Sequence, residues 1–279
     1  MTKLYGILFS CLCLALVSRS HAADMVLPKL PDWQVLEFEE KAFWATARSR
    51  LELLPVADDK EHWDLNVLSS VVDNSEQIVV RFDPATGRAL TRSRLSRGKE
   101  QRLKSYRYEA DFILRERHNP GADASASPQE WPLSYSGKVS YPSTAGDTVV
   151  TEPYLLVLLA QRLQALGPDK SMEVIVHTDL NFYRVRLTSG NGIPINADYT
   201  VTGQGRVSGK RETLAVALQV TPEGTLAEGT DFSLLGLQGE IILFFDSRSG
   251  LPLQVRGTAP RIGPTAINLK SVTMRESRQ

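Results

Sequence analysis

Hydrophobic and polar residues alternate with a period close to two over most of the chain, which is typical of β-strands that bury one face. The alternation is clearest in residues 104–117, where Tyr106, Tyr108 and Phe112 share one face, and it is also clean in residues 213–220. Clusters of Asp, Asn, Pro and Gly between such segments predict tight turns. The pattern therefore predicts a mainly β protein whose first half is an antiparallel meander. The predicted strands are residues 44–53, 63–72, 77–82, 88–96, 104–117, 173–182, 183–187, 199–202, 213–220, 240–245, 251–255 and 267–274.

Two segments of the chain admit more than one interpretation. Residues 33–40 follow Asp32, which can cap a helix, so a short helix is predicted there, with a strand as the alternative. At Phe182 and Tyr183 the hydrophobic positions change from even to odd numbers. A bulge or a tight bend at this point would keep every side chain on its proper face of the sheet.

One helix is predicted, at residues 153–166. Pro153 suits the first helical position, and Gly167 followed by Pro168 ends the segment. Leucine and valine lie on nearly all sides of it, so we expect the helix to be buried rather than to lie on the surface.

Residues 119–147 form a long connection rich in Pro, Gly, Ser and Ala. Connections of this length are usually functional or disordered. Trp131, Tyr135 and Tyr141 suggest that part of it packs on the protein as a flap, and an idle surface loop is the alternative. We interpret it as an insertion in a single β-rich domain of residues 23–279.

The first residues have the anatomy of a cleaved secretory signal peptide. Lys3 precedes an apolar run at residues 4–17, and Ser20-His21-Ala22 offers a cleavage site after Ala22 or Ala23. A lipoprotein signal at Cys11 is the alternative. We therefore expect a periplasmic protein with no membrane-spanning segment after cleavage. Both cysteines lie in residues 1–22, so the mature chain is predicted to have no disulfide and no thiolate chemistry.

The charge of the chain argues against nucleic-acid binding. The full sequence has 32 basic and 32 acidic residues, and loss of Lys3 and Arg19 with the signal leaves a net charge of −2. Residues 81–117 are locally basic, with a net charge of +6. This surplus predicts a basic sheet edge or outer face toward phosphate-bearing envelope components. The alternative is that these charged strand residues only face solvent and oppose aggregation.

Two His-x-Asp pairs are the sharpest candidates for chemistry. They are His62 with Asp64 and His177 with Asp179, each on a predicted strand. Residues two apart share a strand face, so the four side chains would hold a metal ion if the strands were neighbours. No nucleophile elbow, P-loop, dinucleotide fingerprint or zinc-protease motif occurs. No catalytic residue and no cofactor is predicted from the motifs.

Residues 243–257, LFFDSRSGLPLQVRG, followed by Ile262-Gly263 and Leu269, resemble a family of exported proteobacterial proteins, number 3108 in the domain-of-unknown-function series. The resemblance implies a curved antiparallel sheet, a half-barrel around the helix at about 153–166, similar to periplasmic lipoprotein carriers. The family has no assigned activity, so the resemblance transfers no catalytic residue.

Together, these features favour a non-enzymatic protein that binds a lipid, another apolar ligand or an envelope protein in the concavity between sheet and helix. Two alternatives are a metal-dependent hydrolase that uses the two His-x-Asp pairs and a structural protein of envelope assembly. The residues predicted to line the apolar site are Tyr106, Tyr108, Phe112, Leu155, Leu158 and Leu159.

Overall fold

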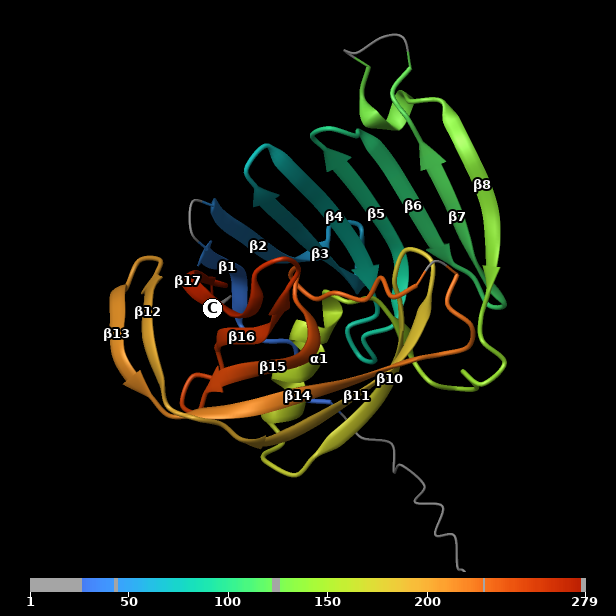
Figure 1. Ribbon diagram of the computed structural model, residues 1–279. Helices are drawn as coiled ribbons and strands as arrows, with labels where there is room; N and C mark the ends of the chain where they lie inside the picture. Colours follow the sequence, from blue (N-terminus) through green and yellow to red (C-terminus); the bar gives the residue numbers. More distant parts are fainter. Residues whose placement is uncertain (1–26, 43–44, 122–125, 228, 277–279) are drawn as a thin grey trace, which may run out of the picture.

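The computed structural model describes residues 27–42, 45–121, 126–227 and 229–276, which form a mainly β protein around one helix, α1 (Leu155–Gln164) (Figure 1). The predicted signal peptide and its cleavage site lie outside the described residues. Within the described part of the chain, no helix has the length and apolarity needed to cross a membrane. The strands are β1 (Trp33–Ala42), β2 (Ala45–Val56), β3 (Asp59–Val71), β4 (Asn74–Phe82), β5 (Ala89–Arg97), β6 (Arg102–Tyr108), β7 (Phe112–His118), β8 (Leu133–Ser140), β9 (Val150–Thr151), β10 (Ser171–His177), β11 (Phe182–Asn191), β12 (Ile195–Val201), β13 (Gly205–Arg211), β14 (Thr213–Pro222), β15 (Gln238–Asp246), β16 (Pro252–Ala259) and β17 (Gly263–Met274), with a short 3₁₀ helix at Pro128–Glu130 before β8.

Most of the strands belong to one long antiparallel sheet. Its central order runs β10, β11, β14, β15, β16, β17, β1, and then β2 to β8 in chain order. The short β9 pairs in parallel with β10, and the β12–β13 hairpin joins β17 through a two-residue parallel bridge. The sheet curves around α1 without closing into a barrel (Figure 1). The predicted fold class, a curved and mainly antiparallel sheet with one buried helix, is confirmed.

Alternating burial explains why the segments form strands. In β12 every second residue from Ile195 to Val201 is buried, and the residues between them are exposed. Such a segment gains free energy only when one face packs on a core, because each fully buried aliphatic side chain contributes about 1.5–3 kcal/mol. The main core lies on the concave side of the sheet and includes every leucine of α1.

The helix is buried on all sides, as its sequence predicted, although it is shorter than the predicted 153–166. All ten of its residues are buried, including the polar Gln161 and Arg162. Trp33 of β1 donates its indole N–H to the Gln161 side chain at 2.8 Å, and Arg162 donates to the backbone carbonyls of Pro28 and Pro84. These bonds satisfy the polar groups of the helix, as burial requires, and they tie it to the sheet and to the chain before β1.

Two tight turns, at residues 83–87 and 246–250, each begin with Asp and end with Gly, and their geometry matches. Gly87 donates its N–H to the carbonyl of Asp83, and Gly250 donates to that of Asp246, each at 2.8 Å. Both glycines have positive φ, 78° and 68°, which side chains with a Cβ rarely adopt. A Cβ at Gly87 would also lie only 2.7 Å from a methyl group of Leu159 on α1. Glycine is therefore required there both by the turn and by the packing of the helix.

Three sequence predictions were wrong in detail. Residues 33–42 form the strand β1, so the alternative to a helix holds. The predicted strand 104–117 is two strands, β6 and β7, joined by a turn at residues 109–111. The predicted strand 173–182 ends at His177, and of the two predicted causes of the change in hydrophobic phase the tight bend holds, at residues 178–181 between β10 and β11. Within the expected insertion, residues 133–140 form β8, which pairs with β7.

Candidate functional site

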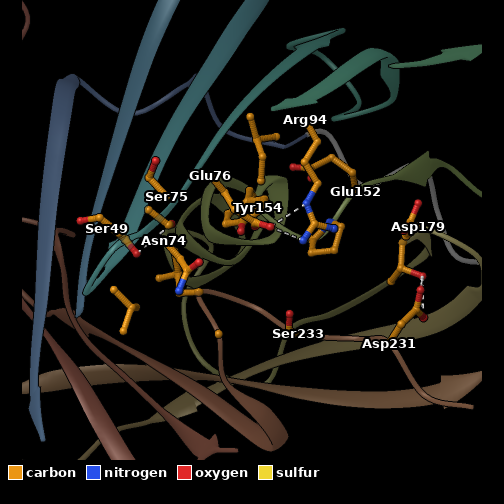
Figure 2. A pocket seen from close by; sticks show the side chains of 18 of the residues that line it. Ser49, Asn74, Ser75, Glu76, Arg94, Glu152, Tyr154, Asp179, Asp231 and Ser233 are labelled. Atoms are coloured by element: carbon orange, nitrogen blue, oxygen red, sulfur yellow. Dashed lines mark hydrogen bonds and ion pairs between the residues drawn. The ribbon is translucent and has the colours of Figure 1, made fainter. Parts of the chain in front are cut away.

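A pocket of about 560 Å³ opens on the concave side of the sheet. Its wall consists of the inner faces of β2 to β6, residues 152–154 before α1, and two connections at residues 178–180 and 231–236 (Figure 2). The pocket therefore brings together segments that are more than 150 residues apart. The residues that line the pocket include Ala47, Ser69, Val71, Glu76, Ile78, Arg92, Arg94, Arg102, Glu152, Tyr154, Thr178, Asp179, Leu180, Asp231 and Leu235.

The inner face of the sheet changes from apolar to basic between β4 and β5. Strand pairing places Val80 beside Arg92, and Arg92 beside Tyr106 of β6. The next row along the strands places Ile78 beside Arg94, and Arg94 beside Lys104. Since residues two apart point to the same side of a strand, the arginines of β5 face the interior with the core residues of β4.

Arg94 forms an ion pair with Glu76 at the rim of the pocket. Its Nε donates to Oε1 of Glu76 at 3.1 Å, and the Ser96 hydroxyl donates to the same oxygen at 3.3 Å. Figure 2 shows the two charged groups pointing toward each other beside Tyr154. Both side chains are about one third exposed, so the ion pair is partly screened by solvent.

Arg92 is the most deeply buried cation of the pocket, with 6% of its surface exposed. It donates to the backbone carbonyls of His177 and Thr178, and its guanidinium lies 3.9 Å from the centroid of the Tyr106 ring. Burial by itself would lower the pKa of Arg92, but neighbouring tyrosines and carboxylates raise it above its ordinary value. Arg92 is therefore a permanent positive charge, and its Nε has no hydrogen-bond partner among the described residues.

Glu152 faces Arg92 from the chain segment before α1 and has no exposed surface. One carboxylate oxygen accepts the backbone N–H of Leu155 at 2.9 Å and so satisfies a free donor at the start of the helix. Among the described residues, the other oxygen has no partner. Burial raises the pKa of Glu152 to about 7, although Arg92 and backbone N–H groups act in the opposite direction. This carboxyl group therefore carries only part of a negative charge at neutral pH.

Asp179 closes the far end of the basic wall. It accepts hydrogen bonds from Lys104 and from the hydroxyl of Tyr106, and Arg115 of β7 lies within 3.3 Å. Burial by itself would raise the pKa of Asp179, but Lys104 and Tyr106 hold it well below its ordinary value. One carboxylate thus serves two cations, Lys104 and Arg115, in addition to the tyrosine.

Asp231 fastens the connection between β14 and β15 over the pocket. Its carboxylate accepts from the Thr178 hydroxyl at 2.7 Å, the Asn181 amide at 2.9 Å and the Tyr183 hydroxyl at 3.0 Å. Burial opposes ionisation, but these bonds keep the pKa of Asp231 below its ordinary value. Further along, Leu235 has a φ of 53°, a strained value for a residue with a side chain. The hydrogen bonds of Asp231 therefore hold the connection in place, where it covers one side of the pocket.

The six residues predicted for an apolar site do not line this pocket. Leu155, Leu158 and Leu159 are buried in the main core, where α1 packs against the sheet. Tyr106 is buried beneath Arg92, and the Tyr108 hydroxyl lies 3.4 Å from Nδ1 of His177. The sixth residue, Phe112, is only partly buried and lies against Lys138. These side chains support the pocket from behind or belong to the core.

The two His-x-Asp pairs lie on separate parts of the sheet. His62 and Asp64 are both on β3, where His62 bonds Asp59 and Asp64 accepts two bonds from Arg81. His177 ends β10 and is fully buried, whereas Asp179 lies in the following connection. Strands β3 and β10 do not pair, and no group of three or more potential metal ligands occurs among the described residues. The predicted metal site required the two strands to be neighbours in the sheet, and they are not.

Sequence reasoning missed Arg92, Arg94 and Glu152 as pocket residues. The basic surplus of residues 81–117 was recognised, but it was assigned to an outer face because charged strand residues usually meet water. The available signal was the spacing of Arg92 and Arg94, two apart in a segment whose alternate residues had to face the core. Nothing in the sequence indicated which carbonyl and carboxylate groups would meet them there.

Similarity to known proteins is found among solved structures only. No family model matches the chain, and a search of curated proteins finds no match. Among solved structures, the chain is similar to a β-barrel-like protein of the domain of unknown function DUF1849 from Brucella abortus. The identity is 10% and the TM-score 0.47, and the match covers 90% of this chain and 100% of the other. The chain is thus similar to a β-fold domain of unknown function.

Proposed function

We propose that this protein binds an amphiphilic ligand in the pocket between the sheet and the start of α1, without transforming it. The observation that carries the proposal is the two-sided wall of the pocket. Ala47, Val71 and Ile78 offer an apolar surface, whereas Arg92 and Arg94 offer hydrogen-bond donors. The volume of about 560 Å³ lies within the range of roughly 300–1,000 Å³ that is usual for small-molecule sites.

The arrangement favours binding because both walls of the pocket are held in place by contacts within the protein. The helix is held by its own core contacts and by Gln161 and Arg162. The sheet supplies the opposite wall through strands that pair over their full length. A pocket formed before the ligand arrives avoids the free-energy cost of ordering its walls on binding.

The proposal is tested with the neutral fluorescent dye N-phenyl-1-naphthylamine, whose emission rises in an apolar site. Ser69 lines the pocket on β3, so Ser69→Trp should fill it and weaken dye binding at least tenfold. Ser208→Trp on the exposed face of β13 is the matched control and should bind as the wild type does. Absence of dye binding to the wild type, or equal binding to Ser69→Trp, overturns the proposal.

Export to the periplasm and membership of the 3108 family are part of the same proposal. They rest on the anatomy of residues 1–22 and on the run at 243–257. Expression in a Gram-negative host with mass analysis of the periplasmic fraction tests export. The expected mature chain begins at Ala23 or Asp24. Recovery of the intact chain from the cytoplasm alone contradicts export.

A further inference from the structure

We propose that the polar end of the ligand is an oxyanion, a carboxylate or a phosphate ester on an apolar chain, and that Arg92, Arg94 and Arg102 recognise it. This inference rests on the proposed function, because it names the chemical class that the same pocket takes. The three guanidinium groups line the pocket from the adjacent strands β5 and β6. Guanidinium groups suit oxyanions because their N–H donors match the spacing of two oxygens.

The pairing of charges on the inner wall favours an anionic ligand. Among the described residues, four arginines and four acidic residues line the pocket, but Asp179 is already paired with Lys104 and Arg115, which do not line it. Arg94 takes Glu76. Among the described residues, no carboxylate lies within ion-pair distance of Arg92, which is bonded to two carbonyls instead. A buried cation without a paired anion favours an incoming negative charge.

Donors without acceptors are in excess at this end of the pocket. The Nε atoms of Arg92 and Arg102 are buried, and neither has a partner among the described residues. A buried donor left without an acceptor costs about 1–3 kcal/mol, so a ligand that brings oxygen atoms relieves that cost. The unpartnered acceptor that lines the pocket is the second oxygen of Glu152. Donors thus predominate at this end, and a cationic or purely apolar ligand would leave them unsatisfied.

The protonation state of Glu152 also favours an anionic ligand. It is the carboxyl group placed to neutralise Arg92, yet burial raises its pKa to about 7. When Glu152 is protonated, its hydroxyl becomes a further donor toward the pocket and Arg92 keeps its full charge. Tyr154 adds a partly buried phenol to the same wall. Glu152 and Tyr154 then add donors beside the arginines, whereas the carboxylates of Glu76 and Asp179 are occupied by their own ion pairs.

The apolar lining of the pocket indicates that the rest of the ligand is an apolar chain. Ile78, Leu180 and Leu235 face the same space as the arginines. An inorganic anion would leave this apolar surface against water, whereas an alkyl or acyl chain removes it from water at about 25 cal/mol per Å². Free phosphate or acetate is therefore expected to bind weakly, and the same head group on a chain is expected to bind well.

The experiment compares dodecanoate, dodecyl phosphate and the neutral dodecanamide as displacers of N-phenyl-1-naphthylamine at pH 7. The two anions should displace the dye at concentrations at least tenfold lower than the amide, and raised salt should reduce this preference. Equal displacement by the anions and the amide overturns the inference and leaves the proposed function intact. Failure of the dye to bind wild-type protein defeats the proposed function itself.

A pair of variants on one strand assigns the preference to the basic wall. Arg102 lines the pocket, and its ion pair is with the exposed Glu100, so Arg102→Gln should leave the fold intact. It should reduce the affinity for both anions about fivefold to tenfold without changing that for the amide. Arg107→Gln on the exposed face of β6 is the control and should change neither. An equal loss for all three ligands in Arg102→Gln would contradict recognition of the anion.

Discussion

Arg92 and Tyr106 are direct partners across β5 and β6, and the guanidinium of Arg92 lies 3.9 Å from the centroid of the Tyr106 ring. The hydroxyl of the same tyrosine donates to Asp179. Tyr106 therefore contacts a buried cation through its ring and a buried anion through its hydroxyl. This arrangement lets opposite charges stay close in the interior without forming a direct ion pair, which reduces the cost of burying Arg92.

Two substitutions of Tyr106 separate the roles of ring and hydroxyl. Tyr106→Phe keeps the ring under Arg92 and removes one hydrogen bond to the charged Asp179, which should cost about 1.5–3 kcal/mol in the free energy of unfolding. Tyr106→Leu also removes the cation–π contact, worth about 2 kcal/mol when desolvated, and should be clearly worse. Urea unfolding measures both. Equal losses in the two variants would show that the ring does not stabilise Arg92.

The connection that covers the pocket depends on Asp231. Asp231→Asn replaces a charged acceptor by an amide, so at least one donor among Thr178, Asn181 and Tyr183 loses its partner. Bonds to charged acceptors contribute about 1.5–3 kcal/mol each, and we expect a loss of that order. Amide hydrogen exchange should accelerate in residues 229–237 and much less in β3 and β4. Uniform acceleration throughout the protein would indicate a global effect instead.

Asp231 also contributes to acid sensitivity. Its folded pKa lies below the ordinary value of 3.8, so its stabilisation is complete above that value and is lost as pH falls through the folded pKa. Below about pH 4 the wild type should therefore lose stability that Asp231→Asn has already lost. Unfolding measured from pH 6 down to pH 3 should show the two proteins converging. Parallel curves would contradict this role.

The alternation of hydrophobic residues predicted most strands because each needed one buried face. It failed at Glu109–Asp111, where the turn between β6 and β7 contains neither glycine nor proline and interrupts no obvious pattern. It also placed Phe112 on the inner face, whereas the turn gives that position to Ile113, which is fully buried. The helix was recognisable because Pro153 and Gly167 mark its two ends.

The pocket was harder to predict because it depends on residues far apart in the chain. Arg92 meets the carbonyls of His177 and Thr178, and these are 85 and 86 residues away. Their approach depends on how far the sheet curves, and local pattern carries no information about that curvature. An acidic residue before a helix, such as Glu152, is common as a favourable partner of the helix terminus, so its sequence position alone did not indicate a pocket.

Glu152 should make stability fall as pH rises. Its pKa is about 7 in the folded protein against an ordinary value of 4.5, so between these values the unfolded chain has released a proton that the folded chain retains. The loss reaches about 3 kcal/mol above pH 7. Glu152→Gln keeps an oxygen for the N–H of Leu155 and removes this loss. It should be more stable than wild type at pH 8 by that order and by under ~1 kcal/mol at pH 5.

His177 acts in the opposite direction. Burial and the positive charge of Arg92 hold the pKa of folded His177 well below 6.5. Below pH 6.5 the unfolded chain therefore binds a proton that the folded chain does not bind. Stability is complete above about pH 6.5 and falls as pH decreases toward the folded pKa. His177→Phe keeps an aromatic ring beside Tyr106 and Phe182 and should remove this fall.

The two groups therefore offset each other in wild-type protein between about pH 5 and pH 6.5. Glu152 lowers the free energy of unfolding by up to about 1.4 kcal/mol for each pH unit of increase, and His177 acts in the opposite direction. Glu152→Gln should therefore gain stability with rising pH relative to wild type, and His177→Phe should lose it. The double variant should show no slope from this pair. Single variants with the same slope as wild type would show that neither group retains its buried protonation state.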